Sequence, residues 1–485
     1  MADAARLYDQ VAGELRALIT RGALRPGDRL PSVRRTAKDR SVSISTVLAA
    51  YLQLENEGLV ETRPKSGHFV LRRDTPPPSA HRPRLVVVPA RPSVFEGVRA
   101  LLDSLRDPAV VPLGSAVPGI DLLPIRALNR TLATLAREAT TAGAHYESVA
   151  GVATLRRQLA RRSATWGAPL PEDEFIPTVG ATEALHVALG AVARPGDTVA
   201  VASPTYFGVL QLFESMGLRA LDVPCSPERG LDLDALESTL RASTVRAVVC
   251  SPNYDNPLGA LMPDDRKERL VRLCARHDVP LVEDDVYGDL GFDGTRPRPA
   301  KAFDSTGHVL LVGSISKTLA PGYRLGWLVA GRYQRAVEQR KRSTTLATPT
   351  LPQMAVAEYL ARGGYDRHLR TMRARLAQQV QRFREEIALR FPAGTRVSQP
   401  RGGFVLWVEL PRTVDALRLQ AEALERGVSI APGPIFSARG RFGSCVRISC
   451  GFPWSARIEA ALRLVGDLAA AQAAQAPARR RDTSA

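Results

Sequence analysis

The chain has 485 residues, enough for two or more domains, and its hydrophobic content of 45% is ordinary for a folded protein with a large core. No run approaches the roughly 18 apolar residues of a membrane span, and the N-terminus lacks a signal peptide's apolar stretch, so we expect a cytoplasmic protein that does not contact membranes. The formal net charge of +17 favours an anionic partner, nucleic acid first, although sixty arginines against six lysines also indicate a coding bias toward arginine.

The five cysteines predict buried, reduced thiols. They form no Cys-x-x-Cys pair, and no histidine stands at metal-ligand spacing from them. Such cysteines in a cytoplasmic chain are more often small core residues than disulfides or zinc ligands. We therefore expect no metal site.

The first seventy residues have the pattern of three helices followed by a β-hairpin. Apolar residues recur on one face of 5–20, which predicts an amphipathic helix. Ser32 can cap a second helix and Ser43 a third, because a serine hydroxyl accepts a hydrogen bond from a free amide at a helix start. Two short strand patterns follow, at 59–62 and 68–71. This order predicts a winged helix-turn-helix.

The remaining chain divides by composition. We predict that the DNA-binding domain covers 1–73, where thirteen Lys and Arg stand against eight Asp and Glu, and that a Pro- and Arg-rich linker covers 74–93. From 94 to 468, β-like runs alternate with helical periodicity, which predicts an α/β domain with a mostly parallel sheet. The Ala/Gln-rich tail 469–485 is expected to be disordered. The clearest strand patterns are Thr198–Val201, Ala247–Cys250, Pro280–Val282 and Val309–Val312.

One lysine has the surroundings of a cofactor site. Lys317 follows the strand pattern 309–312 and lies between Ser314 and Arg324. A lysine in such a setting can form a Schiff base with an aldehyde, while hydroxyl groups and an arginine can hold a phosphate. The aldehyde that also carries a phosphate is pyridoxal 5′-phosphate.

The N-terminal domain resembles the GntR family of winged-helix regulators. The matching segments are Leu24–Arg34, Val42–Val47 and Tyr51–Val60, together with the wing glycine Gly67. The resemblance implies that double-stranded DNA is a partner. It implies a set of DNA-contacting residues, namely Arg34, Ser43, Ser45, Thr46 and Gly67. The alternative is that the serines only cap helices and turns, and for Ser43 we expect both roles.

Two positions depart from the GntR pattern. Ile44 and Leu48 stand where that family commonly has basic residues. The loss of two cations predicts weaker phosphate contact or a shifted operator sequence.

Residues 94–468 resemble fold-type I aminotransferases through a series of separated motifs in the right order. The matching segments are Tyr146–Arg156, Gly180–Glu183, Pro204–Tyr206, Asn256–Gly259, Val282–Tyr287, Ser314–Arg324 and Val446–Ser449. The resemblance implies that Lys317 is the catalytic lysine that binds the cofactor. It implies a set of phosphate-binding residues, namely Ala181, Thr182, Ser314, Ser316 and Arg324.

The same resemblance implies the groups around the cofactor ring. Tyr206 would stack on the ring, while Asn256 and Tyr287 would hydrogen-bond its phenolic oxygen. An aspartate opposite the pyridine nitrogen would keep it protonated. By the family's spacing we assign Asp284 to that role rather than Asp285.

Two further residues concern the ligand and the quaternary structure. The resemblance implies that Arg447 binds the ligand's α-carboxylate, for which a planar guanidinium is well suited. It also implies that Tyr146 reaches into the site of a partner subunit, so we expect a homodimer.

A GntR-like head on an aminotransferase-like body resembles the MocR-type regulators, and the stretch Val111–Pro124 is similar to a short-linker subgroup of them. We therefore predict a pyridoxal-phosphate-dependent transcriptional regulator that senses an amino acid, an amine or a vitamin B6 form. The first alternative is a catalytically active aminotransferase that carries a DNA-binding head. The second is a metabolic enzyme whose head serves only assembly.

Overall fold

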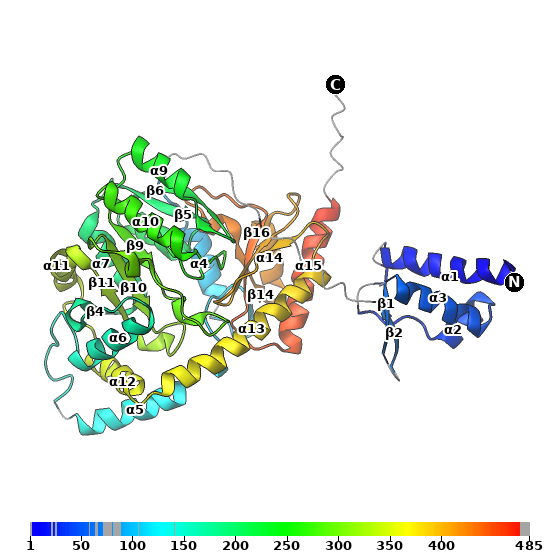
Figure 1. Ribbon diagram of the computed structural model, residues 1–485, viewed down its shortest axis with the longest axis horizontal. Helices are drawn as coiled ribbons and strands as arrows, with labels where there is room; N and C mark the ends of the chain where they lie inside the picture. The colour runs from blue at the N-terminus through cyan, green and yellow to red at the C-terminus, as the bar shows by residue number, and fades with distance from the viewer. Residues whose placement is uncertain are drawn as a thin grey trace. The chain divides into compact units, whose positions relative to one another are not determined.

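The chain folds into two compact units. The computed structural model describes residues 2–20, 23–24, 27–57, 59–63, 66–70, 80, 89–104, 106–139 and 141–475. The smaller unit lies within residues 1–76, and the larger unit is built from nearly all of the remaining chain (Figure 1). The described residues contain no helix long and apolar enough to cross a membrane and no cluster of His, Cys, Asp or Glu side chains that could hold a metal ion.

The smaller unit is a winged helix-turn-helix, as predicted. Its elements are α1 (Ala2–Thr20), α2 (Val33–Arg40), α3 (Ile44–Asn56), β1 (Val60–Arg63) and β2 (Gly67–Val70), and the two strands pair antiparallel. Both predicted caps are present. The Ser32 hydroxyl accepts a hydrogen bond from the Arg35 amide at 3.3 Å, and the Ser43 hydroxyl accepts one from the Thr46 amide at 3.1 Å.

Tyr51 joins α3 to α2 in the core of this unit. Its ring is fully buried, and its hydroxyl donates to the Pro31 carbonyl at 2.8 Å and lies 2.9 Å from the Thr36 hydroxyl. Val47 and Leu54 pack on the same inner face of α3. The buried phenol of Tyr51, with its two hydrogen-bond contacts, therefore supports the packing of the two helices together with these apolar contacts.

The larger unit is built on an eight-stranded sheet. Its strand order is β4-β11-β10-β9-β8-β5-β6-β7. In the stretch β10-β9-β8-β5-β6, each strand runs parallel to its neighbours. The four strand patterns expected from the sequence all lie in it. The strands are β4 (Phe175–Thr178), β5 (Thr198–Ser203), β6 (Arg219–Ser226), β7 (Gly230–Leu231), β8 (Ala247–Cys250), β9 (Leu281–Asp284), β10 (Val309–Ser314) and β11 (Gly326–Val329).

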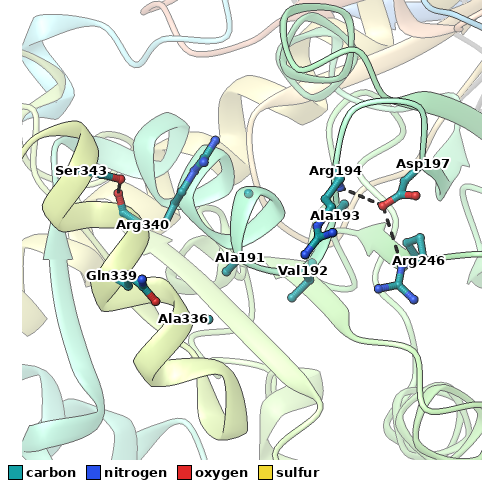
Figure 2. Close-up of a pocket in the computed structure, with 11 residues that line it drawn as sticks. Ala191, Val192, Ala193, Arg194, Asp197, Arg246, Ala336, Gln339, Arg340 and Ser343 are labelled. Atoms are coloured by element: carbon teal, nitrogen blue, oxygen red, sulfur yellow. Dashed lines mark hydrogen bonds and ion pairs between the residues drawn. The ribbon is translucent and has the colours of Figure 1, made fainter.

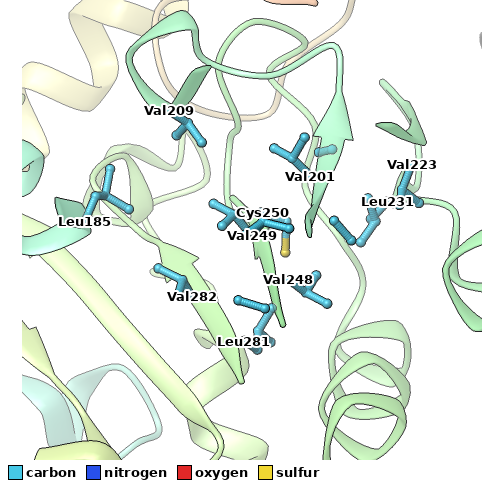
Figure 3. Close-up of a cluster of buried hydrophobic side chains, with 14 of the residues drawn as sticks. Leu185, Val201, Val209, Val223, Leu231, Val248, Val249, Cys250, Leu281 and Val282 are labelled. Carbon is cyan, nitrogen blue, oxygen red and sulfur yellow. The ribbon is translucent and has the colours of Figure 1, made fainter. Parts of the chain in front are cut away.

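Helices cover this sheet, and their apolar faces form the main core. Figure 3 shows Leu185 of α7 in one cluster with Val201, Val249 and Val282 of the central strands. These strand residues are almost completely buried, as expected for parallel strands covered on both faces. The covering helices and their neighbours are α5 (Ile125–Glu138), α6 (Ala153–Thr165), α7 (Gly180–Val192), α8 (Phe207–Ser215), α9 (Leu233–Ala242), α10 (Asp264–Arg276), α11 (Gln334–Thr344) and α12 (Thr350–Ala361).

A second, four-stranded sheet forms the C-terminal part of the larger unit. The 27-residue helix α13 (Gly364–Arg390), yellow in Figure 1, precedes it in the chain. The strand order is β12-β13-β16-β15. The elements are β12 (Arg396–Val397), β13 (Val405–Glu409), β15 (Ala431–Pro432), β16 (Cys445–Ser449), α14 (Ala416–Glu425) and α15 (Ala456–Gln475), with α4 (Phe95–Ser104) and the short pair β3 (Val111–Pro112) and β14 (Val428–Ser429) beside them in the fold.

One expected helix end differs from the structure. The sequence predicts that the last helix ends near Leu468, but α15 continues to Gln475 because Ala469 and Gln472 are buried. The Gln472 side-chain oxygen accepts a hydrogen bond from the Asp415 backbone amide, and its side-chain nitrogen donates one to the Glu422 carboxylate, each at 3.1 Å. Most of the expected linker 74–93 lies outside the described residues. Within it, Ala90 exchanges two 2.8 Å backbone hydrogen bonds with Ala220, which attaches it to the large sheet.

We predict that Tyr51→Phe loosens the smaller unit alone. The change leaves the Pro31 carbonyl without its donor, a loss of about 1–2 kcal/mol. Amide hydrogen exchange in α2 and α3 should become roughly 5- to 30-fold faster. All four tryptophans lie beyond residue 160, so tryptophan fluorescence during denaturation serves as the control and should be unchanged. Unaltered exchange in α2 and α3 would contradict the role assigned to this phenol.

Candidate functional site

The predicted cofactor residues lie together at the carboxyl ends of the parallel strands. β9 ends at Asp284 and β10 ends at Ser314, three residues before Lys317. Ligands of open α/β sheets bind at this edge. A cavity of about 280 Å³ is lined by eleven of the predicted residues, namely Ala181, Thr182, Tyr206, Asn256, Asp284, Tyr287, Ser314, Ser316, Lys317, Arg324 and Arg447.

One end of the cavity has the features of a phosphate site. The Ser314 hydroxyl donates to the Leu325 carbonyl at 3.0 Å and contacts the Ser316 hydroxyl at 2.8 Å. Arg324 lies directly over Gly180, where a side-chain carbon would approach its guanidinium to 2.5 Å. Gly180 also has a φ of +74°, which favours glycine. Both the backbone conformation and the closeness of Arg324 therefore require glycine at this position. The sequence pattern included Gly180 but did not identify this requirement.

Lys317 faces the middle of the cavity. Its ammonium donates to the Ala116 carbonyl at 2.8 Å. Burial lowers its pKa to about 8, and the cations Arg447 and Arg324 act in the same direction while Asp284 opposes them. An amine with this pKa is a better nucleophile at neutral pH than a solvated lysine.

Asp284 and Asp285 have different surroundings. Asp284 lines the cavity, and burial raises its pKa to about 6. Asp285 is held outside the cavity lining by Arg296 at 2.5 Å and by the Asn253 amide at 2.8 Å. Asp285 therefore belongs to a buried ion-pair network, and Asp284 is the carboxylate that a bound ring could contact.

The remaining ring-facing groups include an unsatisfied hydroxyl. Tyr206 lines the cavity beside Phe207, with ring centroids 4.8 Å apart. The buried Tyr287 hydroxyl lies beside Asn256 without reaching hydrogen-bond geometry within the described part of the chain. Burial raises the pKa of Tyr287, so this group stays protonated and can donate to a ligand oxygen. With the phosphate end and the lysine, these residues fit pyridoxal phosphate.

Arg447, on β16, supplies a third cation to the cavity, after Arg324 and Lys317. Its guanidinium is 1% exposed, donates to the Asn256 side-chain oxygen at 3.1 Å and bonds the Gly114 carbonyl. Burial lowers its pKa to about 10. No carboxylate of the described chain pairs with it, so a ligand carboxylate can.

The segment after β3 was not predicted as part of the site. Gly114 and Ala116 supply the carbonyl oxygens that hold Arg447 and Lys317, and Val117 lines the same cavity. The sequence singled out Val111–Pro124 only as a family feature, because a backbone carbonyl leaves no signature in the side-chain pattern. Leu101 of α4 and Gln211 of α8 also line the cavity and were missed.

Tyr146 lies apart from these residues. It is 87% exposed, on the segment after α5, and does not line the cavity. Of the predicted cofactor-binding residues, Tyr146 is the one that does not line the cavity of its own chain.

A second hollow, of about 750 Å³, has different chemistry. Figure 2 shows Arg340 on one side of it and Arg194 and Arg246 on the other. Asp197 accepts a hydrogen bond from the Arg194 amide at 2.8 Å and lies 3.8 Å from Arg246. Its lining includes neither a lysine nor an aromatic ring, so it is not the cofactor site.

The predicted DNA-contacting residues lie at the surface of the smaller unit. Arg34 on α2 is exposed, and Ser43 and Ser45 are exposed at the start of α3. The Ser43 hydroxyl contacts the hydroxyls of Ser45 at 2.8 Å and Thr46 at 2.7 Å. In the wing, Gly67 has a φ of +108° and lies under the Arg29 guanidinium.

Two family descriptions match the chain. Residues 113–463 match "Aminotransferase class I and II", and residues 7–70 match "Bacterial regulatory proteins, gntR family". One similar solved structure is the α-aminoadipate aminotransferase LysN of Thermus thermophilus, complexed with N-(5′-phosphopyridoxyl)-L-leucine. It is 28% identical to this chain, with a TM-score of 0.72, and the match covers 78% of this chain and 96% of that one. The fold thus identifies pyridoxal phosphate as the cofactor.

Relatives of similar length carry both parts. The Escherichia coli HTH-type transcriptional regulators YjiR and YdcR are 36% and 38% identical, each over 95% of this chain and 98% of their own length. The 2-aminoadipate transaminase of Thermus thermophilus is 32% identical over 73% of this chain and 88% of its own. The whole-chain matches support the transcriptional regulator interpretation over an aminotransferase with a DNA-binding head.

We predict that covalent capture of the cofactor follows the ionisation of Lys317. Only the neutral amine attacks an aldehyde, so the rate should rise about tenfold per pH unit below pH 8 and level above it. Arg447→Met removes a cation that lowers this pKa, so its midpoint should move to higher pH. The measurement is stopped-flow absorbance after mixing with pyridoxal phosphate. Arg194→Met is the matched control, and the same midpoint in both variants would contradict the electrostatic coupling.

Proposed function

Because the chain belongs to the class I and II aminotransferase family and carries a GntR-type head, we propose that it is a regulator of the MocR type whose body senses an amino acid, an amine or a vitamin B6 form. The observation that carries the proposal is the pairing of a DNA-binding head with a cavity faced by Lys317 and by Arg447, a cation without a carboxylate partner among the described residues. That cavity can bind a small anionic amine and the cofactor together.

The cofactor would be held by groups of known position. Ser314, Ser316 and Arg324 would bind its phosphate, with the start of α7 supplying further donors through Ala181 and Thr182. When bound, pyridoxal phosphate supplies an aldehyde and an electron-withdrawing ring. Lys317 would bind the aldehyde carbon, and Asp284 would hold a proton on the ring nitrogen.

A ligand with a carboxylate would act on the segment after β3. Arg447 is now engaged by the Gly114 carbonyl, and Lys317 by the Ala116 carbonyl. A carboxylate on Arg447 would compete with the Gly114 carbonyl, and an amine that replaces Lys317 on the cofactor would free Lys317 to donate again to the Ala116 carbonyl. A ligand shifts a conformational equilibrium only by its difference in affinity between two states, and this change at two carbonyls of one segment is such a difference.

The proposed functional form is a cytoplasmic homodimer. Tyr146 is 87% exposed, Ile120 is 73% exposed and Val117, which also lines the cavity, is 37% exposed. Val117 lines the cavity and Ile120 follows it in the same segment, so their exposure favours coverage by a second copy, which could bring its own Tyr146 to the site. Two heads would then match a DNA site with two half-sites.

Catalytic turnover is the second candidate function. Lys317, Asp284 and Arg447 together are the groups that transamination requires, and the 32% identity to a 2-aminoadipate transaminase favours retained activity. In this alternative the head would bind DNA without responding to the ligand.

The proposal predicts one response measured in two ways. Amino acids, vitamin B6 forms and polyamines are titrated while cofactor absorbance and DNA affinity are followed, and an effective ligand should change both with the same midpoint, as linkage requires. Arg447→Met should weaken carboxylate ligands selectively, and Lys317→Ala should abolish the absorbance change. Arg194→Met serves as control. Transamination at ordinary rates, roughly 10 per second, with no change in DNA affinity would support the alternative.

The head should account for binding to duplex DNA. Affinity should fall steeply with salt because bound phosphates release counterions. Arg34→Ala should weaken binding and, if it contacts a phosphate, reduce the salt slope by about one. Arg106→Ala, an exposed arginine of the larger unit, is the control. Unchanged affinity after removal of residues 1–73 would contradict this placement. Fluorescence anisotropy at several salt concentrations is the measurement.

A further inference from the structure

The start of α3 presents an apolar stripe to solvent. Ile44 is 51% exposed, Leu48 is 48% exposed and Leu52 is 58% exposed. Their spacing of four residues places them on one side of the helix, next to but outside the inner face that holds Tyr51. Ser45, also exposed, lies on the same side near the helix start.

This stripe lies outside the packing of the head. The core of the smaller unit contains Val47, Ala50, Tyr51 and Leu54 of α3, and none of the three stripe residues. Single exposed apolar side chains are ordinary. Here, however, three exposed apolar side chains lie along α3, the second helix of the helix-turn-helix. In this motif the second helix is the element that enters the major groove.

We propose that Ile44 and Leu48 read thymine through its C5-methyl group in the major groove of duplex DNA. The proposal rests on the proposed function, since it requires the head to bind DNA. Aliphatic side chains have no donor or acceptor, so they cannot read the hydrogen-bonding edges of bases. The thymine methyl is the apolar feature of the major groove, and contact with it removes both surfaces from water.

The geometry of the helix sets the spacing of the thymines. Ile44 and Leu48 are four residues apart, about 6 Å along the axis. Base pairs are about 3.4 Å apart, so the two side chains reach bases at most about two steps apart. Ser45 can bond a base edge beside them. Leu52 lies about 12 Å from Ile44, beyond the N-terminal residues that contact bases.

The test is a set of double-mutant cycles between side chains and base methyls. A 30-base-pair duplex is selected from a randomised pool on the full-length protein with pyridoxal phosphate. Each thymine is then replaced by uracil, which removes only the methyl. At two positions at most about two steps apart, replacement should weaken binding about fourfold, the equivalent of about 0.8 kcal/mol per methyl. Ile44→Ala should abolish the penalty at one position and Leu48→Ala at the other.

Leu52→Ala is the matched control, because it shortens an equally exposed leucine of the same stripe and should leave both penalties intact. All three residues are exposed, so circular dichroism should show unchanged folding. Equal penalties in the wild type and in both variants would overturn the proposal. So would dimer dissociation in Ile44→Ala with methyl sensitivity retained, which would assign the stripe to a protein partner. Binding without any methyl effect refutes this inference alone, whereas failure to bind any duplex refutes the proposed function with it.

Discussion

Beside Arg324 at the phosphate end, two further cations, Lys317 and Arg447, face one small cavity, and the site depends on them. They come from segments 130 residues apart. Burial is the main cause that lowers the pKa of each. Like charges in such a space are unfavourable unless anions accompany them. Within the described residues, the anionic group that lines the cavity is Asp284, whose own pKa is raised by burial. The cavity is therefore preorganised for ligands that carry negative charge, which a phosphate and a carboxylate both supply.

The surrounding structure keeps other charges away from this space. Arg296 is sandwiched between Asp285 at 2.5 Å and Asp289 at 2.9 Å, and its guanidinium also lies 4.4 Å from the ring centre of Trp166. Asp289 also accepts a hydrogen bond from Tyr365, which bonds the Thr318 hydroxyl at 2.9 Å. Because Thr318 follows Lys317, this buried network fixes the backbone of the cofactor lysine without placing a competing carboxylate on its amine.

The head follows a different physical logic. Its helix-turn-helix is held by caps and by one buried phenol, while the outer side of α3 combines hydroxyl groups with exposed aliphatic side chains. Arg34 lies on α2, and the first turns of α3 carry no cation. The cations on these two helices are therefore those of α2, among them Arg34.

Much of this protein could be predicted from the sequence, because the relevant signals are local. Ser32 and Ser43 as caps, the β-runs that became β5, β8, β9 and β10, and the order of the cofactor motifs each depend on a few contiguous residues. The structure alone decided what long-range packing controls. The carbonyls of Gly114 and Ala116 reach Arg447 and Lys317 only after distant segments meet. For Asp285 the structure added the physical reason behind the family's spacing, because this carboxylate bonds Arg296 and does not line the cavity. The helix α15 extends to Gln475 because Ala469 and Gln472 in its last turns are buried. Burial and backbone contacts of this kind are properties of the folded chain, so side-chain patterns in the sequence do not contain them.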